Sequence, residues 1–525
     1  MSSSLSRRTL LGAGLLAGVA PGGRSLARPH PVSLRGSAWP DQVPLGPARR
    51  FDFERLKRMA RDLAARPYAP PPAPDAERTA HFSYDAFGAV SYRPEATLWP
   101  SPGLARAVRF YPLGAPAPRP VAMHIVQGDQ AREILYTPSL FREPADKPLE
   151  ALGAHAGFGG FRILNAKDET DWLSFLGASY FRCADPFNQY GLSARGLAIN
   201  TARTGHEEFP AFRAFWIEGD PTGPLTVYAL LDGPSVVGAY RLAHARGPQG
   251  LVQTITVALR FRAAVDQLGL APLTSMYWYN ANDRTPRDDW RPQIHDSDGL
   301  SIWTGAGERL WRPLRDPPRD QVQLSLFPDR GPRGFGLMQR ERHATAYQDD
   351  LDRYELRPSA WVEPIGDWGP GAVSLVELPS DTEAEDNIDV FWTPAAPVRA
   401  GQDLAYAYRL HWTDEEPGPV NVARTLATRT GPADTITAIA PPGGRRFVID
   451  FQGASLDALT SADGVTPQVR TSRGRLLGVT VTRGEGLWRL RFDLEAPLGA
   501  PIDLRASLTR DGAPLTETWA ARTFS

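Results

Sequence analysis

Proline and glycine interrupt this chain so often that long helices have little room to form. The 525 residues include 50 prolines and 48 glycines, spread along the whole length. Between about Phe82 and Trp392 these breaks separate short runs that are apolar or alternating, among them "AVRFYPLG", "LTVYALL", "TITVALRFRA" and "AVSLVEL". Such runs, bounded by turn-forming residues, are typical of strands. Helical patterns are too few for βαβ units, so the sequence predicts an all-β protein.

One segment near the N-terminus has the helical period instead. In residues 51–67 the apolar side chains recur every three or four positions, which places them on one face of a helix. Asp52 can cap the first turn, and Pro67 ends the pattern. We expect an extended lead-in over 28–50 and a proline-rich linker over 68–79 on either side of this helix.

A second unit is predicted in the last quarter of the chain. The segment 392–402, "WTPAAPVRAGQ", is rich in proline and small residues and is typical of a boundary. Beyond it the alternation sharpens, as in "LAYAYRLHW" and "LWRLRFDL", and Asp511-Gly512 predicts a tight hairpin turn. About seven strands in this length indicate an immunoglobulin-like sandwich. The predicted domains are therefore 28–395 and 396–525.

Residues 1–27 are predicted to be a twin-arginine export signal. Arg7-Arg8 precedes a mildly apolar run, and Ser25-Leu26-Ala27 places small residues before a cleavage site. The run is too short and too glycine-rich to span a bilayer. We therefore expect a soluble periplasmic protein with no membrane insertion after signal removal. Its single cysteine, Cys183, cannot form an intramolecular disulfide.

Charge and motifs exclude several classes of function. The chain has 58 basic and 59 acidic residues, a net charge of −1, which gives no electrostatic basis for binding nucleic acid. The sequence contains no HExxH, paired CxxC, Walker or GxSxG motif, and the glycine-rich segment 153–161 lacks the Lys-Ser/Thr of a phosphate loop. Nine scattered histidines do not suggest a zinc site. No cofactor and no metal is predicted.

The segment "HDSDGL", residues 295–300, packs two carboxylates and an imidazole into four positions, and acidic residues crowd the region 280–390 around it. Cleavage of a glycosidic bond needs one carboxylic acid to protonate the leaving oxygen and a second carboxylate to activate water or to attack. Tryptophans and arginines interleaved with these acids also fit a sugar groove. Turn chemistry, solvated loops and core packing explain the same residues, and a calcium loop would need ligands that are missing here.

Eight longer motifs carry a resemblance to a known family. They are "SYFRCADPFNQYGLSARGLAI" (179–199), "EEFPAFRAFWIE" (207–218), "VYALLDGPSVVGAYR" (227–241), "GLAPLTSMYWY" (269–279), "RPQIHDSDGLS" (291–301), "RGFGLMQRER" (333–342), "YELRPSAWVEPIGDWGPGAVSLVELP" (354–379) and "EDNIDVFW" (385–392). Over nearly the whole mature chain they resemble the periplasmic glucans biosynthesis family OpgG/OpgD (MdoG/MdoD), and the twin-arginine signal favours the D-type.

This resemblance implies a large N-terminal β-sandwich of the galactose-mutarotase-like class and a C-terminal immunoglobulin-like domain. It implies a role in making osmoregulated periplasmic glucans, whose backbone is β-1,2-linked glucose. Characterised members resemble inverting endo-β-1,2-glucanases, and some relatives instead cyclise the chain through an α-1,6 link.

By motif, the resemblance places the general acid on Asp386 and the general base on Asp298. Tyr354 matches a substrate-side tyrosine. Asp386 must stay protonated, which burial or a neighbouring carboxylate such as Asp296 or Glu385 would favour. His295 is expected to support the site through hydrogen bonds. The predicted substrate-binding set consists of Tyr354, Asp296, His295, Arg291, Trp303 and Trp361.

The acceptor of the transferred sugar stays open at this level. The segment 430–447 matches the family only loosely, and in the family a loop near here can reach a partner subunit's cleft. Three hypotheses remain: an inverting β-1,2-glucan hydrolase, a cyclising transglycosylase, and a non-catalytic glucan-binding scaffold. The expected partner is β-1,2-glucan, with a homodimer implied by the resemblance alone.

Overall fold

The structure is a computed structural model. It describes residues 39–524 apart from 73–83, 101–105, 115–116, 145–148, 150–151, 153–155, 166–169, 204–205, 220–224, 283–288, 435–443, 460, 498 and 500. The predicted export signal at 1–27 lies outside these residues. Within them, no helix is both long enough and apolar enough to cross a membrane.

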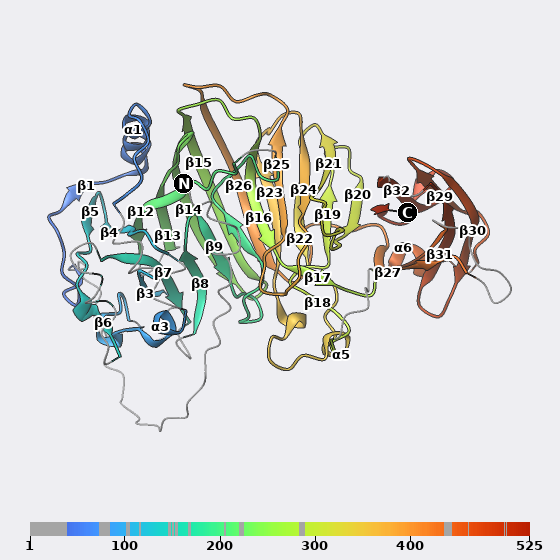
Figure 1. Ribbon diagram of the computed structural model, residues 1–525, viewed down its shortest axis with the longest axis horizontal. Coiled ribbons are helices and arrows are strands. Elements are labelled where there is room, and N and C mark those ends of the chain that lie inside the picture. Colours follow the sequence, from blue (N-terminus) through green and yellow to red (C-terminus); the bar gives the residue numbers. More distant parts are fainter. Residues whose placement is uncertain are drawn as a thin grey trace.

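The larger of two main sheets runs through most of the molecule (Figure 1). Its sixteen described strands lie in the order β1 (Arg49–Arg50), β5 (Gln130–Glu133), β4 (Ala122–Gln127), β12 (Ala211–Glu218), β13 (Leu225–Asp232), β14 (Val236–Gly247), β15 (Gly250–Phe261), β26 (Asp403–Thr413), β23 (Ser359–Ile365), β22 (Gly334–Met338), β19 (Gly299–Trp303), β20 (Arg309–Pro313), β34 (Thr518–Phe524), β32 (Pro501–Arg510) and β29 (Val465–Thr471), with β33 (Ala513–Pro514) beside β32.

The second sheet packs against the first to form a sandwich. Its ten described strands are β21 (Gln323–Asp329), β24 (Gly371–Glu377), β25 (Ile388–Pro394), β16 (Leu268–Ser275), β10 (Ser193–Arg195), β9 (Tyr180–Cys183), β8 (Asp171–Leu176), β7 (Phe158–Leu164) and β3 (Ala107–Pro112), with β11 (Ala198–Ile199) beside β16. Strand alternation builds the core between them: Ile388, Val390 and Trp392 of β25 are fully buried in it together with Val257 and Leu410 of the larger sheet. The predicted all-β class and β-sandwich are confirmed.

A smaller sandwich lies at the C-terminal end, shown in red in Figure 1. A four-stranded sheet of β27 (Arg424–Pro432), β28 (Arg445–Gln452), β31 (Trp488–Glu495) and β30 (Arg475–Arg483) encloses a second core with β34, β32 and β29. We call β27–β34 the C-terminal sandwich. Its core contains Phe447, Phe492 and Trp519, and it also takes Trp311 and Trp361 from strands of the larger sandwich.

The division predicted at residue 396 stays a prediction, but one strand bears on it. β26, residues 403–413, pairs with β15 and β23 and contributes Tyr408 and Trp412 to the first core. The second core takes no residue before Ala423 from the chain beyond β26. Residues 392–402 therefore connect two strands of the same sandwich, since β25 lies in the smaller sheet and β26 in the larger one.

Among the short elements, local sequence signals predict one helix and one turn, and both form. The described helices are α1 (Phe53–Ala64), α3 (Tyr84–Ala89), α5 (Ala344–Tyr347) and α6 (Ala454–Asp457), with 3-10 turns η2 (Pro94–Ala96), η3 (Pro138–Leu140) and η5 (Tyr354–Leu356), and with strand pairs β2 (Ser91–Tyr92)–β6 (Phe141–Arg142) and β17 (Tyr277–Tyr279)–β18 (Ile294–His295). Asp52 caps α1 as predicted, accepting from the backbone N of Arg55 at 2.6 Å. Asp511 and Gly512 have φ of 51° and 80°, which a tight hairpin turn requires.

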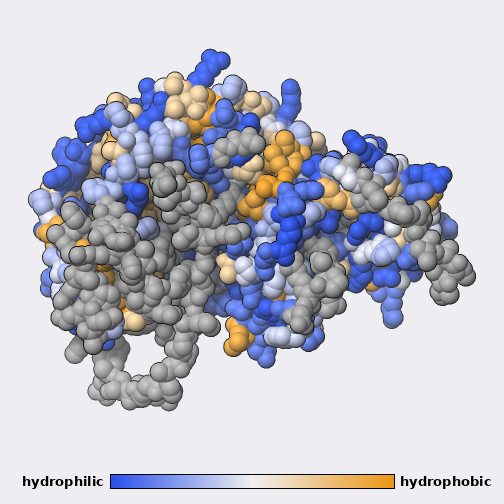
Figure 2. Space-filling model, in the orientation of Figure 1, coloured by the Kyte–Doolittle hydropathy of each residue, from blue (hydrophilic) through white to orange (hydrophobic). Residues whose placement is uncertain are grey.

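Polar residues dominate the face of the molecule seen in Figure 2. An apolar area lies over the region of β21 and β24, where Leu326 of the edge strand β21 is 54% exposed.

Candidate active site

Asp298 lies where three strands of the larger sheet meet. Its backbone N donates to the carbonyl of Met338 at the end of β22, and its carbonyl accepts from Leu314 just after β20. The side-chain Oδ2 accepts two hydrogen bonds of 3.0 Å, from the backbone N of Arg340 and of Glu341. Oδ1 is buried and has no hydrogen-bond partner among the described residues.

Burial raises the pKa of Asp298 to about 6, although the Arg340 charge and the two backbone amides oppose this. Near neutral pH the group is therefore largely ionised and can take up a proton. Its free oxygen is an acceptor for a water molecule, because a carboxylate oxygen buried without a partner loses the hydrogen bonds it made in solvent. These are the properties of a general base.

Asp386 lies in the loop between β24 and β25. The next residue, Asn387, fixes this loop through its side chain, which bonds both the backbone N and the carbonyl of Tyr277 and donates to the carbonyl of Leu378. Asp386 Oδ2 lies 3.2 Å from Nη2 of Arg182, which stands on β9.

Burial also raises the pKa of Asp386 to about 6. The Arg182 charge lowers it, while the negative charges of Asp296 and Asp389 raise it further. Asp296 is therefore placed where its charge raises the pKa of Asp386, and its role in the site stays a prediction. At pH 6 about half of the Asp386 carboxyl groups carry a proton, which is the property that a general acid needs.

Two arginines stand between the neighbourhoods of these two acids. Arg357 pairs with Asp296 at 3.3 Å, and its charge acts on Asp386. Arg342 donates to the carbonyl of Arg357, and its charge acts on Asp298. Asp296 therefore acts electrostatically on Asp386, and a chain of contacts through Arg357 and Arg342 leads from these two residues to Asp298.

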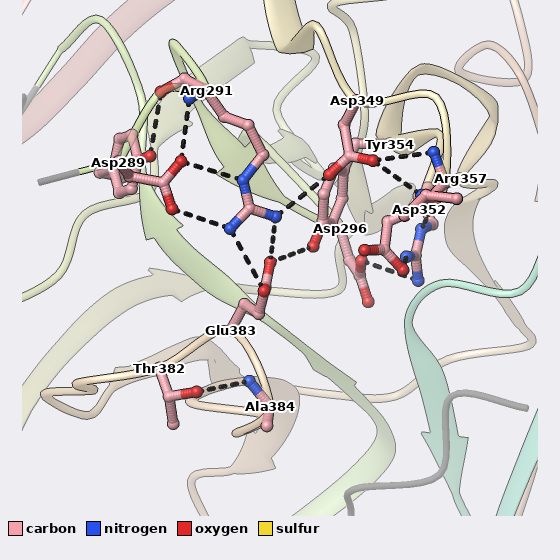
Figure 3. A network of polar contacts seen from close by, with 12 residues as sticks. Asp289, Arg291, Asp296, Asp349, Asp352, Tyr354, Arg357, Thr382, Glu383 and Ala384 are labelled. Carbon is pink, nitrogen blue, oxygen red and sulfur yellow. Dashed lines mark hydrogen bonds and ion pairs between the residues drawn. The ribbon is translucent and has the colours of Figure 1, made fainter. Parts of the chain in front are cut away.

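Arg291 is the centre of a network drawn in Figure 3. Its guanidinium donates to Asp289 at 3.0 and 2.8 Å, to Asp349 at 3.1 Å and to Glu383 at 2.7 and 3.2 Å. These bonds use all five N–H groups of an arginine. Glu383 Oε2 in turn accepts from the Tyr354 hydroxyl at 2.7 Å. Arg291 therefore has no donor left for a sugar hydroxyl in this arrangement, and it orients Glu383 and Tyr354.

His295 is held in one orientation inside the protein. Its Nδ1 lies 2.9 Å from Oε1 of Gln339, whose Nε2 donates to the carbonyls of His295 and Tyr354. The amide nitrogen is thus used as donor, so His295 Nδ1 carries the proton. Burial lowers the pKa of His295 to about 3, which keeps the ring neutral. This geometry agrees with a supporting role through hydrogen bonds.

The two tryptophans of the predicted substrate set lie elsewhere. Trp361 is 1% exposed and belongs to the second core, which corrects its assignment to substrate binding. Trp303 is the last residue of β19, whereas Asp298 directly precedes the first residue of that strand. The guanidinium of Arg309 stacks on the Trp303 ring, 3.8 Å from its centroid. A tryptophan among polar residues gives the same sequence signal whether it packs in a core or faces a ligand.

Four residues that define the site are absent from the set predicted from the sequence: Arg182, Arg340, Arg357 and Glu383. Each lies inside or beside a quoted motif, but its contact is to a residue distant in the chain, such as Asp386 for Arg182 across 204 positions. Among the described residues, no three or more His, Cys, Asp or Glu side chains are grouped so as to hold a metal ion.

Comparisons with known proteins agree on one family. The family model described as "Periplasmic glucan biosynthesis protein, MdoG" matches residues 51–523. The chain is 44% identical to glucans biosynthesis protein D 2 of Ralstonia nicotianae, over 91% of each chain, and 42% identical to glucans biosynthesis protein G of Rhodopseudomonas palustris, over 92% of this chain and 95% of the relative.

Among solved structures, a galactose mutarotase related enzyme from Lactobacillus acidophilus aligns with 49% of this chain and 93% of its own, at 10% identity and a TM-score of 0.22. A likeness of this size supports no conclusion, so the galactose-mutarotase-like type of the larger sandwich stays a prediction.

Proposed function

Because the chain belongs to the MdoG family of periplasmic glucan biosynthesis proteins, we propose that it acts in the periplasm on the β-1,2-linked glucose backbone of these glucans, as an inverting endo-β-1,2-glucanase. Membership of this family supports a role in periplasmic glucan biosynthesis. The chemistry is supported by one observation above all: two carboxyl groups, Asp298 and Asp386, have pKa values raised to about 6, and one of them keeps a free buried oxygen.

In the proposed reaction, the protonated Asp386 donates its proton to the glycosidic oxygen as the bond from that oxygen to the anomeric carbon breaks. A water molecule attacks the anomeric carbon from the opposite face, and its proton passes to Asp298, directly or through a further water. The products are two shorter chains, one with a new reducing end of inverted configuration. Asp386 is left ionised and Asp298 protonated, and exchange with solvent restores both.

The test is incubation of the purified mature protein with linear β-1,2-glucan, with products followed by mass spectrometry and the new anomer by NMR. Asp386→Asn should lower the rate by about 10²–10⁴-fold, the usual contribution of a general acid. Asp381→Asn is the matched control, because its side chain lies five positions away in the same loop and is 62% exposed. It should retain full activity.

Other products would decide against hydrolysis. Rings, which are lighter than the linear chain by one water, would establish a cyclising transglycosylase at the same two acids. Glucan binding without any product, equal in the wild type and in Asp386→Asn, would contradict both enzyme hypotheses and leave a scaffold.

A further inference from the structure

We propose that the C-terminal sandwich fixes the position of the catalytic base, and that Arg340 is the positioning residue through which it does so. The proposal rests on the proposed function, because it assigns Asp298 the role of base. It concerns a part of the molecule that contributes no catalytic group of its own.

Arg340 touches the base and the C-terminal sandwich at the same time. Its backbone N donates to Asp298 Oδ2 at 3.0 Å. Its guanidinium donates to Glu517, which directly precedes β34, at 2.7 and 3.1 Å, and to Glu416, which follows β26, at 2.5 Å. The same group stacks on Trp311 of β20, 3.6 Å from the ring centroid.

The ion pairs of Arg340 with Glu416 and Glu517 are buried. The Glu416 and Glu517 side chains are 3% and 2% exposed, and that of Arg340 is 15% exposed. Charges removed from water are costly unless each keeps its partners, so the guanidinium cannot leave the two carboxylates without a large penalty. Glu517 is itself fixed, since it accepts from the backbone N of Thr425 at 2.6 Å.

Holding the Arg340 side chain also holds the backbone amides that bind Asp298, because they belong to the same short segment of the chain. The two amides that hold Asp298 belong to residues 340 and 341, and the Tyr347 hydroxyl fixes the same segment by donating to the carbonyl of Glu341 at 3.1 Å. Among the described residues, the charged and titratable groups that act on Asp298 are Arg340, Arg342 and Tyr347. Arg340 lowers the pKa of Asp298 both by its charge and by its amide.

Arg309 provides a matched control. It belongs to the same cluster, with Nη1 3.6 Å from Glu416 Oε2, and it also stacks on a tryptophan, Trp303. In the part of the chain that the structure describes, it makes no hydrogen bond or ion pair with Asp298. Arg340→Met and Arg309→Met therefore each remove a cation that pairs with Glu416 and stacks on a tryptophan, but only the Arg340 charge acts on Asp298.

The experiment compares kcat/KM against pH for the wild type, Arg340→Met, Arg340→Lys, Glu517→Gln and Arg309→Met, with thermal stability recorded for each. Arg340→Met should lower kcat by at least about tenfold at little change in KM, and should move the acidic limb of the profile to higher pH, because a base with a higher pKa ionises later. Glu517→Gln keeps the Arg340 charge and removes a partner that fixes it, so it should lower kcat without moving the limb to higher pH. Arg340→Lys should restore part of the rate, since it keeps the charge but not the forked geometry.

A second measurement does not depend on activity. The ¹³C resonance of the Asp298 carboxyl, assigned by its loss in Asp298→Asn, should titrate at higher pH in Arg340→Met and at the wild-type value in Arg309→Met. Equal titration in both variants would overturn the proposal. An inactive wild type with a shifted titration would reject the proposed hydrolysis while supporting the positioning by Arg340.

Discussion

The pKa values of Asp298 and Asp386 are raised to a similar level, although different neighbouring groups lower them. Two backbone amides and Arg340 favour the ionised form of Asp298, whereas Arg182 alone is the main cation beside Asp386, which also faces Asp296 and Asp389. Burial outweighs these groups in both cases and raises each pKa to about 6. The active form has Asp298 ionised and Asp386 protonated, so the fraction of active enzyme depends steeply on pH.

We therefore predict a bell-shaped profile of kcat/KM with its maximum near pH 6. Below it Asp298 takes up a proton and above it Asp386 loses one, so the rate should fall about tenfold per pH unit on each side. Initial rates on β-1,2-glucan between pH 4 and 8 measure this. A rate that stays level from pH 6 to 8 would show that Asp386 is not the proton donor.

Trp361 offers a test of the corrected site. Because it is 1% exposed within the second core, Trp361→Ala should lower the free energy of unfolding by about 3–5 kcal/mol. The milder Trp361→Phe should fold and bind glucan with unchanged KM. Trp290→Ala is the stability control, since Trp290 is 68% exposed, and it should change stability by no more than about 0.5 kcal/mol. A raised KM in Trp361→Phe at unchanged stability would return Trp361 to the substrate set.

At the scale of single residues, the sequence predicts contacts that are local in the chain and misses those that are not. Asp296 and Asp298 are two positions apart, so one motif reveals both. The partner of Asp386, Arg182, and that of Asp298, Arg340, are set by the register of strands distant in sequence. The sequence places Arg291 in the site, but only the fold shows that three carboxylates accept all five of its hydrogen bonds.

At the scale of elements, hydrogen bonds of Arg291 connect several loops of the site, and no single strand positions them all. Arg291 joins Asp289 before β18, Asp349 after α5 and Glu383 between β24 and β25. Glu383 lies three positions before Asp386. The network therefore links the loop of the acid to two other loops.

Arg291→Met should loosen the loop that carries Asp386 and lower kcat more than it raises KM. It should also lower the free energy of unfolding by about 3 kcal/mol at pH 7, because it leaves carboxylates without their partner. The hydrogen bond from Arg291 lowers the pKa of Asp289, so this stabilisation is complete above the ordinary pKa of an aspartate and is lost as the pH falls below it. Urea midpoints of the wild type and the variant should therefore converge toward pH 3. A constant difference would contradict the linkage.

Strand alternation and turn chemistry predict elements well in this chain, but not their partners. The period of 51–67 and the Asp511-Gly512 turn are local signals, and both elements form as predicted. The segment 392–402 has the composition of a linker, yet it is a crossing from one sheet of the sandwich to the other, and only pairing with β15 and β23 reveals this.

At the scale of the whole molecule, the two sandwiches share a sheet. β34 pairs in parallel with β20, which places Trp519 opposite Trp311 and continues the larger sheet into the C-terminal sandwich. The second core then covers Trp311, Met338 and Trp361, which belong to the larger sandwich. Each sandwich therefore supplies part of the apolar packing that covers the other.

A chain that ends at residue 420 should therefore fail to fold as a stable monomer. It would retain every strand of the smaller sheet, but β20 would become an unpaired edge and three large apolar side chains would face water, a combination that promotes association. Arg340 would also lose Glu517, the partner that fixes the amide on Asp298. Size-exclusion chromatography and binding of the dye ANS, beside the full mature chain, should show aggregation or exposed apolar surface. A monomeric truncated protein with a Tm within about 2 °C of the full chain, a difference of no more than about 2 kcal/mol, would mean that the C-terminal sandwich is dispensable for the fold.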